Sequence, residues 1–194
     1  RHIQDRDLSL IRQVVRGKLN LEMAPVDEMR GIALDTRPDQ VTLVPERREE
    51  ITTEGGLDVS GQMDRLAAII DPVRAAKILV SLFIDPESHQ IEAAHRLGAD
   101  YIELNTAAYS EARNSEAVGR EISALKKAAD QAHALGLGVH AGHGLTFLNV
   151  EPIASLPHIE ELNIGHSIVS HAVFTGFEAA VGEMVRLVEG RGRS

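Results

Sequence analysis

Apolar and polar positions alternate along the chain in stretches that predict strands and helices in turn. Six runs have the short length and aliphatic content of strands, and helical or loop sequence follows each of them. The runs occupy residues 19–24, 40–46, 77–85, 101–106, 138–142 and 161–167. Regular alternation of this kind is typical of a parallel sheet with right-handed crossover connections. The pattern therefore predicts an α/β fold.

Helical periods fill the intervals between the strands. Apolar residues three and four positions apart predict helices near residues 5–16, 25–34, 63–73, 86–97 and 112–135. Pro72 should interrupt or kink the third of these helices, because proline cannot donate a helical hydrogen bond. After the last strand we expect one helix that carries Val173, Phe177, Met184 and Val188 on one face.

Two architectures accommodate such a succession of βα units: an open doubly wound sheet and a TIM (β/α)8 barrel. No G-x-G-x-x-G motif follows the first strand, which argues against a dinucleotide-binding open sheet. A TIM barrel has eight strands and about 250 residues, so this chain supplies about six of its βα units. We expect residues 1–194 to form a single (β/α) barrel domain that is incomplete at its N-terminus.

Composition narrows the class of protein. The 194 residues are 43% hydrophobic and 25% charged, which suits a globular domain with a sizeable core. The chain has no cysteine, which excludes disulfides, thiolate metal sites and a cysteine nucleophile and is typical of a cytoplasmic protein. Its formal charge of −9 argues against general affinity for nucleic acid. No apolar run is long enough to span a membrane, so neither nucleic acid nor membrane is an expected partner.

Titratable side chains gather at the ends of the predicted strands. In a barrel the carboxyl ends of all strands form one mouth, so these side chains should converge there: Glu22, Glu46, Asp85, Glu103, His143 and His166. Several carboxylates facing two imidazoles favour proton-transfer chemistry, since crowded acids have their pKa values spread apart.

Two of these acids have simpler explanations. Glu46 precedes two arginines and is expected to form a surface ion pair. Asp85 precedes Pro86 and is equally suited to capping the next helix. Glu22 and Glu103 lie within otherwise apolar strands, which favours a functional role for both.

Three further segments suggest how ligands are held. His143 lies between two glycines at a strand end, a common position for chemistry in α/β proteins. The Gly165-His166-Ser167 sequence at a helix start offers free backbone amides to an anion. The polar segment 47–60, with Thr52 and a Gly55-Gly56 hinge, is either a lid over a ligand or a solvated insertion.

A metal site is the main chemical alternative, with His140, His143 and nearby carboxylates as ligands. Odd spacing on a strand points the two imidazoles to opposite faces, so a shared ion would require a sharp bend between them. We therefore expect no metal.

Five motifs spread along the chain are informative as a set. They are Asn20-Leu-Glu22-Met-Ala, Thr52-Thr-Glu-Gly-Gly-Leu-Asp58, Ser81-Leu-Phe-Ile-Asp85, Ala141-Gly-His143-Gly-Leu-Thr146 and Glu161-Leu-Asn-Ile-Gly165-His166. In this order they resemble the pyridoxine 5'-phosphate synthase family, the ring-closing enzymes of one route to vitamin B6, over essentially the whole chain.

The resemblance implies a (β/α) barrel enzyme that condenses 1-deoxy-D-xylulose 5-phosphate with 3-amino-2-oxopropyl phosphate. The products are pyridoxine 5'-phosphate, inorganic phosphate and water, and no metal or organic cofactor is implied. On matching positions, Glu22 resembles the general acid/base and His143 the proton donor. Glu103 resembles the carboxylate that stabilises charged intermediates.

The resemblance also implies substrate contacts and assembly. His2 and Thr52 match positions that contact the deoxyxylulose phosphate. Gly144, Gly165 and His166 match positions that contact the amino-ketone phosphate or the product. The expected partners are therefore phosphorylated small molecules and further copies of the chain in a homo-oligomer.

Two features depart from the family pattern. The family has two more strands, the second ending in a catalytic histidine, before the segment that matches Arg1-His2-Ile3. Without them we expect the chain to be neither closed nor active. The family also has His-Thr-Gly where this chain has Asn105-Thr-Ala107, and asparagine cannot titrate.

Two other functions remain open on the residues themselves. One is a metal-dependent barrel aldolase or hydrolase. The other is a non-catalytic binder of phosphorylated ligands.

Overall fold

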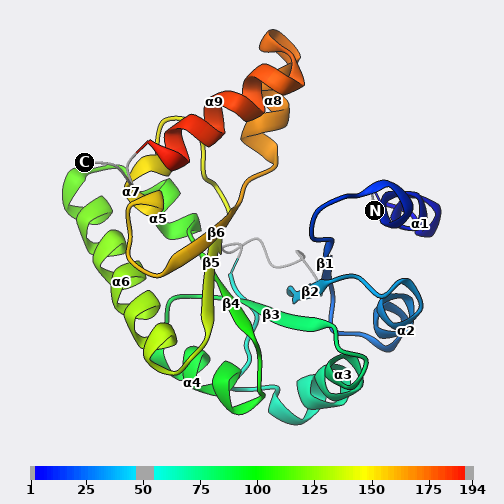
Figure 1. The fold of residues 1–194 in the computed structure, drawn as a ribbon. Helices are drawn as coiled ribbons and strands as arrows, with labels where there is room; N and C mark the ends of the chain where they lie inside the picture. The colour runs from blue at the N-terminus through cyan, green and yellow to red at the C-terminus, as the bar shows by residue number, and fades with distance from the viewer. Residues whose placement is uncertain (1–2, 47–54, 191–194) are drawn as a thin grey trace.

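The computed structural model describes residues 3–46 and 55–190, which contain one parallel sheet flanked by helices (Figure 1). Six strands pair in the order β1-β2-β3-β4-β5-β6, and every pair is parallel. The strands are β1 (Asn20–Met23), β2 (Gln40–Leu43), β3 (Leu79–Ile84), β4 (Tyr101–Asn105), β5 (Gly138–Gly142) and β6 (Ile159–Asn163). Each lies within or overlaps a predicted run, so the α/β fold is confirmed.

Helices follow the strands in sequence. They are α1 (Asp5–Val14), α2 (Asp27–Thr36), α3 (Met63–Ala75), α4 (Ser88–Arg96), α5 (Ala107–Glu111), α6 (Ser115–Ala134), α7 (Val150–Ala154), α8 (His166–Thr175) and α9 (Phe177–Glu189). In Figure 1 the helices α2, α3, α4 and α6 lie along the outside of the curved sheet.

The sheet curves into an open arc. Among the described residues, β1 and β6 are the two ends of the strand order, and each has a neighbour on one side only. Figure 1 shows the arc open between these two edges. The described strands therefore form a half-barrel rather than the closed eight-stranded barrel.

The hydrophobic core lies between the sheet and the outer helices. Alternate strand residues such as Leu43, Leu82 and Leu104 are fully buried in it, as are Leu66 and Ile91 from the helices. Each such side chain contributes about 1.5 to 3 kcal/mol on burial. The hydrophobic periodicity of the sequence thus indicated that one face of the sheet packs against one face of each outer helix.

The other face of the sheet is polar. It carries Asn20, Glu22, Gln40, Thr42, Ser81, Glu103, Asn105, His140, Glu161 and Asn163, which alternate with the core residues. Parallel register aligns Glu103 with His140 and His140 with Glu161. The inner side of the half-barrel is therefore largely polar, and Leu79, Phe83 and Tyr101 share it by register.

The C-terminal helical region differs from the prediction. Instead of one helix, α8 and α9 meet at Gly176, whose φ of 86° and ψ of 149° cannot continue a helix. The expected single apolar face is wrong as a result: Met184 is buried, whereas Val173 and Phe177 are 78% and 63% exposed.

Pro72 does not interrupt α3, which continues to Ala75. A proline at this position leaves the carbonyl of Ala68 without its helical amide donor. The Arg30 guanidinium of α2 donates to that carbonyl at 3.2 Å. A neighbouring helix thus supplies the hydrogen bond that the proline removes.

Candidate functional site

Glu103 is the buried acid of the candidate site. It lies on β4 and is 4% exposed. Asn163 on β6 donates its side-chain Nδ2 to Glu103 Oε2 at 2.7 Å. The other oxygen, Oε1, lies over Gly142 of β5, where a Cβ atom would overlap it. Three adjacent strands therefore hold this carboxyl group.

The surroundings of Glu103 change its acidity. Burial is the largest cause, and together with the negative charges of Glu22 and Glu161 it raises the pKa of Glu103 from 4.5 to about 7. The hydrogen bond from Asn163 acts in the opposite direction. Near neutral pH the side chain is therefore populated in both its protonated and its ionised form.

Glu22 lies on β1, at the edge of the sheet, and is exposed. Its charge acts on Glu103 even though β2 and β3 lie between their strands. The curvature of the sheet explains this, because it turns the inner faces of β1 and β4 toward each other (Figure 1).

His143 follows directly after β5 in a strained turn. Its φ is 84°, an uncommon value for a residue with a Cβ, and Gly144 follows with a φ of 73°. Thr106 Oγ1 stabilises the turn through hydrogen bonds to the carbonyl oxygens of Gly142 at 2.8 Å and His143 at 2.5 Å. The turn is therefore anchored to the end of β4.

The same turn decides where the imidazole of His143 lies. Its ring centroid is 6.3 Å from that of Phe83, the residue aligned with Glu103 across β3 and β4. His140 also lies on this inner face, stacked on Tyr101. The expectation that His140 and His143 point to opposite faces is thus wrong, because the left-handed backbone at His143 ends the strand alternation.

Gly144, Gly165 and His166 belong to two neighbouring segments. Ser167 Oγ at the start of α8 donates to the carbonyl of Leu145 at 2.9 Å, which joins α8 to the loop after β5. Gly165 is the N-cap of α8 without a side-chain cap, so the first-turn amides are available to an anion. Gly144, Gly165 and His166 are all exposed at this junction.

Two predicted contact residues, His2 and Thr52, lie outside the described residues.

Glu46 forms an ion pair with Arg65 of α3 at 2.8 Å, which confirms its expected surface pairing.

Asp85 does not cap the following helix. The N-cap of α4 is Glu87, whereas Asp85 Oδ1 accepts from the backbone amide of Gly56 at 3.0 Å and from Asn105 Nδ2 at 2.8 Å. The capping prediction is wrong because α4 starts later than Pro86, at Ser88. Asn105 thus acts as a neutral donor in the bond to Asp85, at the position where the family pattern has histidine.

A second polar cluster lies nearer the amino ends of the strands. The grouping of its side chains was not predicted from the sequence. Lys18 Nζ contacts Glu161 Oε2 at 2.5 Å, and the His140 and Tyr101 rings stack at 4.6 Å. Burial lowers the pKa of His140, as does the charge of Lys18, while Glu161 opposes the shift. The polar alternation in β5 and β6 was the signal that could have revealed it.

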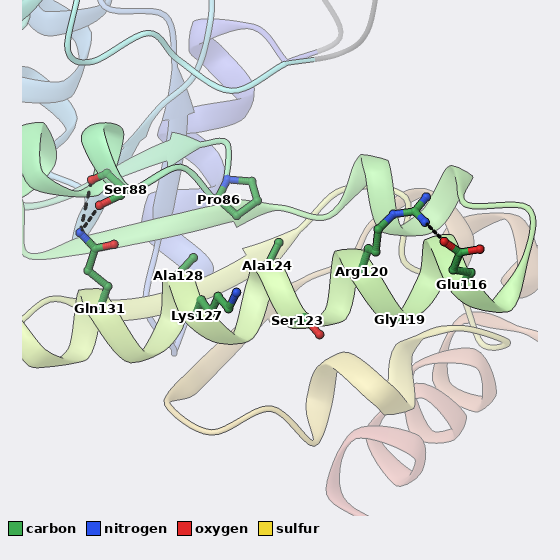
Figure 2. A pocket seen from close by; sticks show the side chains of 10 residues that line it. All are labelled: Pro86, Ser88, Glu116, Gly119, Arg120, Ser123, Ala124, Lys127, Ala128 and Gln131. Carbon is green, nitrogen blue, oxygen red and sulfur yellow. Dashed lines mark hydrogen bonds and ion pairs between the residues drawn. The ribbon is translucent and has the colours of Figure 1, made fainter.

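A groove of about 740 Å³ lies elsewhere, between α6 and the start of α4 (Figure 2). Four of its polar side chains are paired with one another: Arg120 pairs with Glu116 at 2.7 Å, and Gln131 donates to Ser88 Oγ at 2.8 Å. None of the candidate residues lines it. Convergent polar groups thus mark the inner face of the sheet as the candidate site.

The side chains and helices of the structure also bear on metal and membrane binding. Within the described parts of the chain, no group of three or more histidine, aspartate or glutamate side chains is arranged to hold a metal ion. No helix within residues 3–46 and 55–190 has the length and apolarity to cross a membrane.

Known proteins resemble this chain over nearly its whole length. The family model described as pyridoxal phosphate biosynthesis protein PdxJ matches residues 1–190. The pyridoxine 5'-phosphate synthase of Gloeothece citriformis is 56% identical over 191 residues, covering 98% of this chain and 80% of the relative. That of a Cyanothece species is 58% identical over 190 residues, covering 98% and 79%. That of Geobacter sulfurreducens is 55% identical over 189 residues, covering 97% and 79%.

A solved structure supports the fold assignment. The crystal structure of the citrate synthase SbnG aligns with a TM-score of 0.54 at 14% identity, covering 95% of this chain and 79% of that one. At this identity the likeness concerns the fold alone.

Proposed function

The chain belongs to the PdxJ family of pyridoxal phosphate biosynthesis proteins, and from this premise we propose its reaction and the residues that perform it. The family resemblance inferred from the motifs is confirmed, and the chain is a pyridoxine 5'-phosphate synthase. The reaction condenses 1-deoxy-D-xylulose 5-phosphate with 3-amino-2-oxopropyl phosphate. The observation that carries this conclusion is identity of 54% to 58% with curated synthases over 95% to 99% of the chain.

Joining an amine to a ketone, eliminating water and phosphate and closing a ring all need repeated proton transfers. Glu22 is the general acid/base and His143 is the proton donor for these steps. Glu103 is the carboxylate that stabilises charged intermediates. Supporting the role of Glu103, its side chain is almost fully buried and its pKa is raised to about 7, so it changes between acid and carboxylate near neutral pH.

The phosphate of the amino ketone binds at Gly144, Gly165 and His166. Free amides at the start of α8 attract an anion through hydrogen bonds and the helix dipole. The contact between Ser167 and Leu145 supports a shared site, since it holds the two segments together. Local donors of this kind bind phosphate despite the formal charge of −9. His2 and Thr52 contact the other substrate, the deoxyxylulose phosphate.

The function is tested by incubating the purified full-length protein with both phosphates after treatment with a chelator. We expect pyridoxine 5'-phosphate to form, detected by chromatography and mass. Absence of product from the wild-type protein would contradict the proposal. Activity lost on chelation and restored by a divalent cation would support a metal-dependent enzyme instead.

The residue roles are tested separately with Glu22→Gln, Glu103→Gln and His143→Asn. We expect Glu22→Gln and His143→Asn to lower turnover by about 10²- to 10⁴-fold, the usual contribution of an acid or base, and Glu103→Gln to lower it because the stabilising carboxylate is lost. The matched control is Glu111→Gln, because Glu111 is exposed on α5. Wild-type turnover in any of the first three variants would remove that residue from the catalytic set.

A TIM barrel closed by two further strands between β6 and β1 is the architecture we propose for the single domain. Both edges carry unpaired backbone groups, which a neighbouring strand would satisfy.

Self-association through α8 is the assembly we propose. This helix has no buried residue in the chain, and its apolar side chains Val169, Val173 and Phe174 are exposed together with Phe177 of α9. These four residues are called the α8 patch below. Exposed apolar side chains of this kind are typical of a protein interface, and a second copy of the chain is the occupant we propose. Because its substrates carry phosphate groups, we place the enzyme in the cytoplasm.

A further inference from the structure

We infer that Asn163 is a positioning residue for Glu103, fixing the orientation of its carboxylate so that it faces the reacting atoms. The inference rests on the proposed function of Glu103 and adds a residue to it. Asn163 itself makes no contact with the substrate. It acts through the carboxylate that it holds.

The geometry is specific to these positions. Asn163 on β6 reaches past β5 to Glu103 on β4, and its Nδ2 lies 2.7 Å from Oε2. Gly142, aligned with Asn163 in the register of β5 and β6, occupies the space between them. A Cβ at Gly142 would overlap Glu103 Oε1 and come within 3.2 Å of Asn163 Cβ. Glycine at this point of β5 is therefore what permits the bridge.

The charges around Glu103 explain why a neutral amide side chain is suited to holding its carboxylate in position. The titratable groups on the inner face around it are Glu22 from β1, His140 from β5 and Glu161 from β6, together with Lys18, which pairs with Glu161, and His143, whose ring neighbours that of Phe83. Burial and the two glutamates favour the protonated form of Glu103. Asn163 favours the ionised form by donating a hydrogen bond, and it adds no charge of its own.

Two alternatives are less consistent with these contacts. A purely structural polar pair would not require one partner to be almost fully buried among like charges, since an apolar pair of similar shape would pack at lower cost. A direct catalytic role for Asn163 would require its amide to reach substrate, but its Nδ2 is already directed at Glu103.

The test compares kcat, KM and the pH profile of kcat in the full-length protein. Asn163→Leu removes the donor with little change in volume. We expect kcat to fall about 10- to 100-fold, less than on loss of an acid or base, with KM changed less than about threefold. Without the donor the pKa of Glu103 rises, so the acid limb of the profile should move to higher pH, by about one unit. Raising the pH should restore part of the activity.

Two companion variants make the result specific. Asn163→Asp keeps the shape but places a carboxylate beside Glu103, so its acid limb should move further upward. Asn163→Gln retains a donor and should recover part of kcat. Ser81→Ala is the control, since Ser81 lies on the same face and its buried hydroxyl has no hydrogen-bond partner among the described residues.

The outcomes separate the inference from the function on which it rests. An inactive wild-type protein would contradict the proposed function, and a fully active Glu103→Gln would contradict the role of Glu103. With both of those intact, an unchanged kcat and pH profile in Asn163→Leu would overturn the role of Asn163. If Asn163→Leu does not fold, the isosteric Asn163→Asp carries the same test, and an unchanged profile in that variant would overturn it.

Discussion

Glu103 illustrates how the surroundings of a single residue determine its chemistry. Its backbone lies in an ordinary parallel strand, and its side chain is a common glutamate. Burial against the inner face of the sheet penalises the charged form, and two nearby carboxylates add to that penalty. One hydrogen bond from Asn163 offsets part of it. The balance leaves a group that changes protonation near pH 7.

The raised pKa of Glu103 has a consequence for stability. The folded state binds this proton more tightly than the unfolded state, so the contribution is fully present below pH 4.5 and is lost as the pH rises through about 7. The loss is on the order of 3 kcal/mol. We expect Glu103→Gln to lack this dependence and to gain stability relative to the wild type above pH 7.

Urea unfolding at several pH values between 4 and 8 measures this effect as the difference between wild type and variant. Glu111→Gln is the control and should follow the wild-type dependence, because Glu111 is exposed. A constant difference between wild type and Glu103→Gln across this range would contradict the raised pKa.

Thr106 supports the His143 turn through its hydroxyl. Thr106→Val keeps the shape but removes the donor to the buried carbonyl of Gly142 and the partly buried carbonyl of His143, so we expect a loss of about 1 to 3 kcal/mol in unfolding free energy. Turnover should fall as well, because the strained backbone at His143 loses its anchor. Thr106→Ser retains the hydroxyl and should preserve more of both properties. Thermal unfolding and steady-state kinetics of the two variants provide the comparison.

At the scale of elements, α2 and α3 are joined by a polar contact as well as by packing. Arg30 donates to the Ala68 carbonyl, which Pro72 leaves without a helical donor. Arg30→Ala should therefore cost about 1 kcal/mol, toward the low end for a charged donor because the guanidinium is partly exposed.

A double-mutant cycle tests whether the proline creates this dependence on Arg30. In a Pro72→Ala background the new backbone amide can donate to Ala68, so Arg30→Ala should cost less there than in the wild type. Equal costs in the two backgrounds, measured by urea unfolding, would show that Arg30 stabilises the protein in another way. The ion pair of Arg30 with Asp27 is present in both backgrounds and cancels in the cycle.

At the scale of the whole molecule, the half-barrel has an apolar outer face and a polar inner face. The outer face stabilises the fold by burying aliphatic side chains under the helices. The inner face holds the candidate site together with the cluster of Lys18, His140 and Glu161. Core and site are thus separated by a single layer of strands, so an inner-face substitution alters the site while leaving most helix contacts in place.

The α8 patch predicts self-association. Phe174 is 88% exposed in the chain, so Phe174→Glu should leave the fold intact and shift the protein to a smaller assembly. Light scattering and sedimentation over a range of concentrations measure the change. Val14→Glu on α1, another exposed apolar position, is the control and should not alter assembly. A wild-type protein that stays monomeric at high concentration would contradict the proposed interface.

The local pattern of the sequence determined which segments are strands and which are helices. Periodicity depends on neighbours along the chain, so it identified the six strands and most helices. It also singled out Glu103 as an acid within an otherwise apolar strand, and this side chain is buried on the inner face of the sheet. The motifs identified the family for the same reason, because each is a short contiguous stretch.

Tertiary structure alone decided features that depend on residues far apart in the sequence. The bond between Glu103 and Asn163 joins positions 60 residues apart, and the donor to the Ala68 carbonyl comes from another helix. The left-handed turn at His143 and the helix break at Gly176 depend on backbone angles that hydrophobic periodicity does not specify. The pKa of Glu103 likewise follows from burial and from charges on other strands, which exist only once the sheet has curved.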